Sequence, residues 1–339
     1  MQDVTPEDIE EVARLLATGV LSVPSGGILT RFEKRFAKFA GNRHAVAFCN
    51  GTASIYAALW ACGVEAGDDV AVCDYGFHGM AAAVASLGAR MVPVDCLEGS
   101  LTMDAADLLR ARTPRMKAVL VHNPWGVPAD WRSLRAACPD LPLISDASHA
   151  HGATYDGQPL GAQATVTCWS MGYQKLISGG ELGAVSTDDP ELADRMMLLG
   201  HPNRVPRELI GTSWQGNAVG LKLRPHPVAL TLAMGQLKRF DQKLAWLRHA
   251  CSLRERQVVE QTGLVPQAVP EGAERSYWRL VFHGGPREGW PGEPNHYWPP
   301  LQRQSLFDWP SRREQVLRRA CPTLERVAPG LVTLPIPTP

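Results

Sequence analysis

The stretch HAVAFCNGTAS, residues 44–54, joins an apolar run to a glycine-containing turn and to the start of an alanine-rich segment. The apolar run predicts a buried strand, and the alanines predict a helix from about Ala53. Gly51 lets the backbone turn closely, and the N–H groups of Thr52 and Ala53 then form an anion site suited to phosphate. A turn of this kind more often only caps its helix than binds phosphate, so the choice between the two depends on the rest of the chain.

The alternation of apolar runs and helical stretches continues along the chain. Strands are predicted at 69–74, 89–95, 117–122 and 141–146, with further strands of the same sheet at 164–170 and 183–187. Strands that are apolar almost throughout and are separated by helices predict a parallel sheet covered on both faces. Later helices are expected from about Glu191 and from about Pro227 to Thr262.

Length and composition set the expected domain organisation. A chain of 339 residues with 45% hydrophobic content can bury one large core and one smaller core. We assign residues 1–240 to a large α/β domain and residues 241–339 to a small α+β domain. From residue 275 onward the chain is rich in Pro, Trp and Gly, which predicts short strands with irregular connections.

The balance of positive and negative charges indicates which class of ligand the protein binds. Lys plus Arg and Asp plus Glu each number 34, which argues against nucleic acid and anionic membranes and favours a small-molecule ligand. No apolar run approaches the roughly 20 residues of a membrane span, and the acidic start MQDVTPEDIEEVARLL is unlike a secretion signal. We therefore expect a cytoplasmic protein. The eight cysteines form no CxxC pair, so neither a zinc site nor a disulfide framework is expected.

Ligands of open parallel sheets bind at the carboxyl ends of the strands. The nucleotide-binding patterns GxGxxG and GxxxxGKS/T do not occur in the chain. Asp146 ends the strand predicted at 141–146, so its carboxylate should be partly buried and need a cationic partner, such as a protonated pyridine nitrogen. An aspartate that only caps the next turn is equally frequent. His149 and His151 follow closely, but no third ligand stands at a suitable spacing, so we assign no metal.

Lys175 stands in CWSMGYQKLISGGELG, residues 168–183, between a predicted strand and a loop with three glycines. It is either a surface charge exposed by the turn or an amine held in a cleft for chemistry. Pyridoxal 5′-phosphate (PLP) needs three anchors, for its phosphate, its ring nitrogen and its aldehyde. The anion site at 51–53, the strand-end Asp146 and Lys175 supply these anchors in order, which favours the cleft.

Six segments resemble, in the same order, the DegT/DnrJ/EryC1/StrS family of PLP-dependent enzymes, which are mostly aminotransferases of keto sugars and keto cyclitols. They are GGILTRFEKRFAKFAG, NGTASIYAAL, DYGFHGMAAAV, SDASHAHGATYDGQPLGAQA, WSMGYQKLISGGELG and GLKLRPHPVALTLAMGQLKR, within about residues 20–245. The resemblance implies fold type I, the aspartate aminotransferase architecture, with a mostly parallel seven-stranded sheet and a small C-terminal α+β domain. That small domain is expected to be shortened relative to the family, and residues 1–25 to contact it or a partner subunit.

The resemblance also implies roles for individual residues. Lys175 would form the internal Schiff base and, once freed, move the proton between substrate and cofactor. Asp146 would keep the pyridine nitrogen protonated. The other cofactor contacts that the resemblance implies are Gly51, Thr52, Ala53 and Ser170 for the phosphate, His149 near the ring hydroxyl, and Phe77 stacked on the ring. For Phe77 the alternative is a core side chain at the start of a helix.

The segment GLKLRPHP, residues 220–227, is expected to be extended, so that Lys222 and Arg224 point the same way. In the family this segment reaches the neighbouring subunit's site, with an asparagine where this chain has Lys222. The resemblance implies a homodimer with shared sites, in which Lys222 contacts the cofactor phosphate and Arg224 the substrate. A solvated basic turn is the alternative.

Three functions remain open from the sequence. The first is an aminotransferase that moves an amino group from glutamate or glutamine to a keto sugar, keto cyclitol or related polar ketone, in amino-sugar or antibiotic biosynthesis. The second is a PLP enzyme of the same fold that runs a dehydration or elimination. Relatives that dehydrate often lack the Schiff-base lysine, whereas this chain has Lys175. The third is a non-catalytic α/β binding protein, under which three ordered cofactor anchors would be a coincidence.

Overall fold

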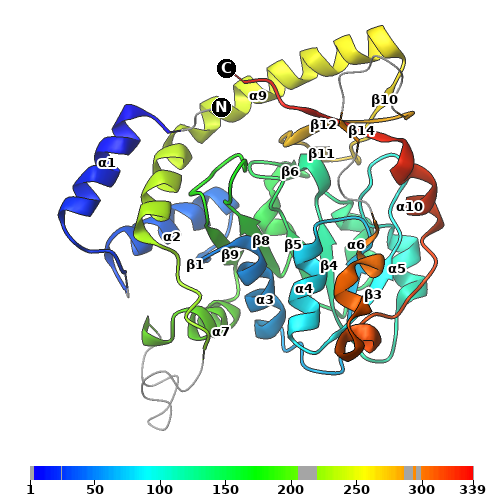
Figure 1. Cartoon of the computed structure of the whole chain (residues 1–339), viewed down its shortest axis with the longest axis horizontal. Helices are drawn as coiled ribbons and strands as arrows, with labels where there is room; N and C mark the ends of the chain where they lie inside the picture. Colours follow the sequence, from blue (N-terminus) through cyan, green and yellow to red (C-terminus); the bar gives the residue numbers. More distant parts are fainter. Residues whose placement is uncertain (1–3, 24, 205–219, 286–292, 295–298, 339) are drawn as a thin grey trace.

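The structure is a computed structural model that describes residues 4–23, 25–204, 220–285, 293–294 and 299–338. A large α/β unit is built on a central sheet. A long helix, α9, runs from this unit to a small sheet formed by the later part of the chain (Figure 1).

The central sheet has seven strands in the order β1-β9-β8-β5-β4-β2-β3. Their bounds are β1 His44–Phe48, β2 Asp69–Cys73, β3 Arg90–Val94, β4 Met116–His122, β5 Leu143–Asp146, β8 Val166–Ser170 and β9 Gly183–Thr187. Only β9 runs against the others, pairing antiparallel with both β1 and β8. The predicted seven-stranded, mostly parallel sheet is confirmed, and each strand begins and ends within two residues of its predicted run.

The sheet is buried on both faces, as its apolar strands predicted. In β2, Val70 and Val72 enter one hydrophobic core, whereas Ala71 and Cys73 enter the other. The helices of the first core are α3 Gly51–Ala61, α4 His78–Ser86 and α7 Pro190–Gly200. Those of the second are α2 Gly27–Ala40, α5 Ala105–Ala111, α6 Trp131–Ala137 and α9 Pro227–Thr262. Alternate side chains therefore pack against helices on opposite sides.

The local sequence explains where helix α3 begins and where helix α9 begins and ends. The α3 helix starts at Gly51 because the Asn50 side chain accepts a hydrogen bond from the Ala53 N–H at 2.8 Å. The α9 helix has Pro227 in its first turn and stops at Gly263, whose φ of 68° ends the helical conformation. The long helix predicted from Pro227 to Thr262 is confirmed.

The later part of the chain forms a small sheet in the order β10-β12-β14-β13. Its strands are β10 Val265–Pro266, β12 Arg279–His283, β13 Glu293–Pro294 and β14 Leu331–Pro335, and helix α10 covers Pro322–Val327. A third sheet joins β6 Thr154–Tyr155, β7 Gln158–Pro159 and β11 Ala273–Glu274. Helix α9 passes residue 240 without a break, so the division into 1–240 and 241–339 stays a prediction.

A segment after residue 299 returns to the large sheet. The Gln302 N–H and Nε2–H donate to the two carboxylate oxygens of Asp74, at 2.8 and 2.6 Å. The Leu317 N–H donates to the Met91 carbonyl of β3 at 2.8 Å. Figure 1 shows this segment, in orange, beside β3. The C-terminal region is therefore divided between the small sheet and the edge of the large one.

The N-terminal helix α1, Pro6–Ala17, packs along α9, where Asp8 pairs with Arg239 at 2.6 Å. Among the helices that the structure describes, none has both the length and the apolar character to cross a membrane.

Candidate active site

The predicted phosphate end of the site lies between β1 and α3. A Cβ added to Gly51 would lie 2.6 Å from the Cβ of Ser170, so only glycine lets the helix start and the end of β8 come this close. The Ala53 N–H is already engaged by Asn50. The Thr52 N–H belongs to the first turn, where helix geometry provides no acceptor, so it is the amide that can meet an anion.

Phe77 lies beside this turn. It is the residue before α4, and it is 40% exposed, so the alternative of a core phenylalanine is wrong. A Cβ added to Gly79 would meet both the Thr52 Oγ1 at 2.7 Å and the Phe77 ring at 2.9 Å. The ring and the Thr52 hydroxyl therefore both lie against Gly79, in the first turn of α4.

Asp146 is the last residue of β5, in register with His122 of β4. Its side chain is almost fully buried at 2% exposure, and one carboxylate oxygen accepts from the Ser148 N–H at 3.0 Å. Within the described ranges no ion pair involves this carboxylate. A buried carboxylate without a cation is costly, so the residue fits a cationic ring nitrogen.

Lys175 lies in the loop between β8 and β9, with its Nζ 4.1 Å from the centre of the Trp278 ring. Burial lowers the pKa of this amine to about 8, while the charge of Asp146 acts in the opposite direction. Of the two readings of this lysine, the structure favours the enclosed amine over the exposed surface charge.

A stack of rings lines the site beside Lys175. His149 stacks on Trp278 with ring centres 3.8 Å apart, and Trp125 stacks on Trp278 at 5.5 Å. Burial, followed by the charge of Lys175, lowers the pKa of His149 well below its usual value, so the imidazole is neutral. Its Nδ1 accepts from the Trp125 N–H at 3.3 Å, which leaves the proton on Nε2. His149 therefore offers one N–H donor, as a contact to a ring hydroxyl oxygen requires.

The cationic segment of residues 220–227 passes the end of β1, where the Cys49 N–H donates to the Leu223 carbonyl at 2.8 Å. The prediction of a continuous extended run is wrong at Lys222, because its φ of 51° turns the backbone. Lys222 is exposed. Burial lowers the pKa of His201 to about 4, and the charges of Arg204 and Arg224 act in the same direction.

Three residues of the site were not predicted. His122 ends β4 next to Asp146, and the rule that ligands bind at strand ends could have found it. Trp125 has a φ of 61° and follows in the same loop. Trp278 precedes β12 of the small sheet, and nothing in its local sequence links it to Lys175.

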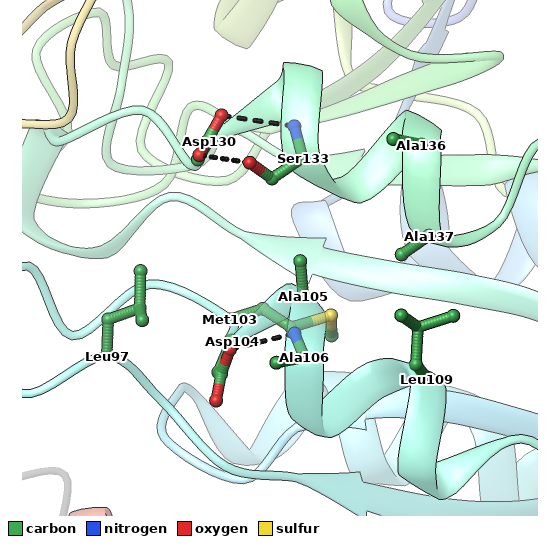
Figure 2. Close-up of a pocket in the computed structure, with 10 residues that line it drawn as sticks. All are labelled: Leu97, Met103, Asp104, Ala105, Ala106, Leu109, Asp130, Ser133, Ala136 and Ala137. Atoms are coloured by element: carbon green, nitrogen blue, oxygen red, sulfur yellow. Dashed lines mark hydrogen bonds between the residues drawn. The ribbon is translucent and has the colours of Figure 1, made fainter.

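A hollow of about 480 Å³ lies elsewhere, between α5 and α6 (Figure 2). It is lined mainly by small and aliphatic side chains, such as Ala105 and Leu109, with Asp104 and Asp130 at its edge. None of the predicted site residues lines it.

The chain is similar to known proteins over most of its length. The sequence model of the DegT/DnrJ/EryC1/StrS aminotransferase family matches residues 2–286. The chain belongs to this family. The six segments follow the order of this family because the chain is a member of it. The fold agrees with a solved structure: 3-amino-5-hydroxybenzoic acid synthase superposes on this chain with a TM-score of 0.85 and 27% sequence identity. That match covers 96% of this chain and 90% of the synthase.

Two curated proteins also align with the chain. Protein MosB of Rhizobium meliloti is 31% identical over 270 residues, which is 76% of this chain and 52% of that protein. L-glutamine:2-deoxy-scyllo-inosose aminotransferase of Streptoalloteichus tenebrarius is 33% identical over 287 residues, 80% of this chain and 67% of that enzyme. The chain thus spans about half of the first relative's length and about two thirds of the second's.

Proposed function

We propose that the protein is a PLP-dependent aminotransferase. The observation that carries the proposal is the pair formed by Lys175 and Asp146. The first is an enclosed amine with a pKa lowered to about 8, and the second is a buried carboxylate without an ion pair among the described residues. An amine of this kind is partly unprotonated near neutral pH, as a proton carrier has to be. Membership of an aminotransferase family supports the same reading.

The residues fit the cofactor as follows. The carboxylate of Asp146 would hold the protonated ring nitrogen, and the His149 Nε2–H would contact the ring hydroxyl oxygen. Thr52 and Ser170 would bind the phosphate, Ala53 would lie at the helix start, Gly51 would let the two segments approach, and Phe77 would cover one ring face. When bound, PLP withdraws electrons from the substrate carbon that loses or gains a proton. The Lys175 amine then takes up that proton and returns it.

Relatives suggest the two substrates. Several are L-glutamine-dependent aminotransferases of inososes, among them one named for scyllo-inosose from Streptomyces griseus. We infer that the amino donor is glutamine or glutamate and that the acceptor is a keto cyclitol, a keto sugar or a related polar ketone. Retention of Lys175 favours transamination over dehydration.

We also propose a homodimer with shared sites, in which Lys222 and Arg224 act on the neighbouring subunit's site. The exposure of Lys222 supports this, because its amine forms no ion pair in the part of the chain that the structure describes. All eight cysteines are unpaired, which suits the reducing cytoplasm.

The test of the function uses purified protein supplied with PLP. We expect a yellow protein that loses its colour on addition of L-glutamine and regains it with scyllo-inosose. Lys175→Ala should show neither change, whereas Lys238→Ala, an exposed lysine on α9, should behave as the parent protein. Stable colour despite L-glutamine would favour the dehydration class, and failure to take up PLP would overturn the proposal.

A further inference from the structure

Three residues other than glycine adopt the left-handed backbone conformation at one place in the molecule. Trp125 in the turn after β4, Gln174 in the loop between β8 and β9, and Tyr277 just before β12 have φ values of 61°, 65° and 62°. A residue with a Cβ is disfavoured in this conformation and keeps it only where the surrounding structure holds it. Each of the three either adjoins Trp278 in the sequence or contacts it.

Trp278 joins these segments to one another. Its backbone N–H donates to the Trp125 carbonyl at 3.0 Å, and its indole Nε1–H donates to the Gln174 carbonyl at 2.8 Å. Its ring stacks on that of Trp125, whose own indole N–H donates to the Tyr75 hydroxyl at 2.8 Å. Tyr75 follows β2 and Trp278 directly precedes β12, so these contacts attach the small sheet to the carboxyl edge of the large one.

Gly126 lets the two backbones approach each other. Its carbonyl accepts from the Ser276 N–H at 3.0 Å. A Cβ added to Gly126 would lie 2.7 Å from the backbone nitrogen of Tyr277 and 3.1 Å from that of Trp278. The φ of Gly126 is 95°, in the region that favours glycine. Residues 276–278 can therefore lie this close to the turn only because position 126 has no side chain.

The Trp278 ring covers the amine of Lys175. The Lys175 Nζ lies 4.1 Å from the centre of the indole, and His149 stacks on the same indole with ring centres 3.8 Å apart. An indole face attracts an ammonium group and keeps water away from it. The indole cannot turn aside without losing its hydrogen bond to Gln174, the residue next to Lys175. Ring and amine are thus fixed relative to each other.

We propose that Trp278 is a positioning residue for the Lys175 amine: its indole holds the amine in place, and the docking of the small sheet holds the indole. Under the proposed function, on which this rests, the amine takes up a proton and returns it, so its place matters. A tryptophan that only filled the junction between the two sheets would stabilise the fold without acting on that amine. The two roles differ in what removal of the ring changes.

The protonation of Lys175 reports the cover that the ring provides. Burial lowers the pKa of this amine to about 8, and the charge of Asp146 acts in the opposite direction. Burial is the larger influence, so loss of the indole should raise the pKa although the indole also attracts the ammonium form. The other titratable or charged groups around the amine, or along the cavity that it lines, stay in the chain when Trp278 is replaced: His122, His149, His151, Lys243 and Arg279.

The test uses the full chain without cofactor and follows acetylation of Lys175 by mass spectrometry across the pH range. A cavity of about 530 Å³, lined by both Lys175 and Trp278, admits the reagent. We expect Trp278→Ala to raise the pH of half-maximal rate by about 1 or more, towards that of an ordinary lysine. Trp278→Phe keeps a ring and should retain most of the parent value. Trp309→Ala, which removes a tryptophan that is 63% exposed, should leave the midpoint unchanged.

A glycine substitution separates positioning from general loosening of the fold. Gly126→Ala displaces residues 276–278 without altering Lys175 or Trp278, so it should raise the midpoint in the same direction. Gly67→Ala is its match, because Gly67 has a φ of 92° and an added Cβ there meets nothing within 4 Å. It should leave the midpoint unchanged. In a Trp278→Ala background, Gly126→Ala should cause no further rise, because the ring that it displaces is gone.

An unchanged midpoint in Trp278→Ala would overturn the proposal, and so would equal rises from Gly126→Ala with and without the indole. With PLP, Trp278→Ala should lower the limiting rate of the L-glutamine half-reaction by about tenfold and change its KM by less than about twofold, because positioning acts on proton transfer and not on binding. A limiting rate equal to that of the parent would also overturn it. PLP takes no part in the acetylation, so failure of the aminotransferase proposal would leave the acetylation result unchanged.

Discussion

At the scale of single residues, Lys175 gives the sharpest pH dependence. Burial lowers the pKa of its amine to about 8, so the reactive, unprotonated form appears at a lower pH than for an exposed lysine. In cofactor-free protein we expect the acetylation rate of Lys175 to reach half its maximum near this pH. The exposed Lys238, acetylated in the same sample, is the reference. Mass spectrometry of both peptides across the pH range measures this, and coincident profiles would contradict an enclosed amine.

The pKa of the Lys175 amine can also be used to test the charge of Asp146. The carboxylate raises the pKa of Lys175, so Asp146→Asn should shift the acetylation midpoint further down. With PLP, the same variant loses the charge proposed to hold the ring nitrogen protonated. We expect the rate of the glutamine half-reaction to fall by at least ~100-fold, on the order of 3 kcal/mol. Asp188→Asn, an exposed aspartate, is the control, and a fall of less than about threefold would make Asp146 only a cap.

Sequence alone could predict those residues whose position follows from a strand end. Asp146 and Gly51 directly follow or end apolar runs, so the topology of a parallel sheet brings them to one edge. Trp278 could not be predicted in the same way. Its contact with Lys175 exists because the small sheet folds back over the large one, and this docking leaves no trace in the residues around it.

At the scale of elements, the strands were predicted well because almost every residue of each is apolar, and burial on both faces requires that. The direction of β9 was not predicted. Its antiparallel course follows from the connection after β8, residues 171–182, which contains no helix to carry the chain back across the sheet. Composition does not encode that direction.

The packing of α1 on α9 depends on one glycine. A Cβ on Gly235 would lie 1.8 Å from the Asp8 carboxylate. Alanine inside a helix normally stabilises by about 0.5–1 kcal/mol over glycine, but here the clash should reverse the sign to a loss of about 1–2 kcal/mol. Urea unfolding measures this. In an Asp8→Ala background the same change should become stabilising, and a loss of equal size in both backgrounds would exclude the Asp8 contact as its cause.

The contact of residues 301–303 with Asp74, which directly follows β2, should make the stability of the protein depend on pH. Burial raises the pKa of Asp74 to about 6, and the charge of Asp95 acts in the same direction. Because the folded protein then binds a proton that the unfolded chain has lost, this group's contribution to stability falls as pH rises from about 4 to about 6. The unfolding free energy of the parent protein minus that of Asp74→Asn should therefore decrease across this window. A difference that is flat between these pH values would contradict a buried, protonated Asp74.

At the scale of the whole molecule, the chain is held together by contacts that cross the predicted division at residue 240. Helix α9 serves both parts, and the orange segment of Figure 1 returns to β3. Such long-range docking depends on tertiary complementarity, as in the two hydrogen bonds from Gln302 to Asp74. Pro- and Trp-rich composition predicted irregular chain there, but not the surface that it covers.

The proposed assembly leads to the last prediction. Lys222 is exposed on a segment anchored by the hydrogen bond from the Cys49 N–H to the Leu223 carbonyl, 2.8 Å long, at the end of β1. A cation on this segment that has no ion pair among the described residues is available to a neighbouring subunit's phosphate. Lys222→Ala and Lys175→Ala should each be inactive or weakly active alone. Mixed and refolded together, they should form hybrid dimers in which one site has both residues.

Random pairing of the two variants makes half of the dimers hybrid, each with one intact site of two, so about a quarter of the parent activity should return. Sedimentation of the mixture should show dimers at micromolar concentration. The control is a mixture of Lys175→Ala with Lys175→Met, whose hybrids contain no intact site and should stay inactive. Full activity of a monomer would refute the shared site. Verified hybrids without recovered activity would refute it as well, because each of them would hold one site with both lysines in place.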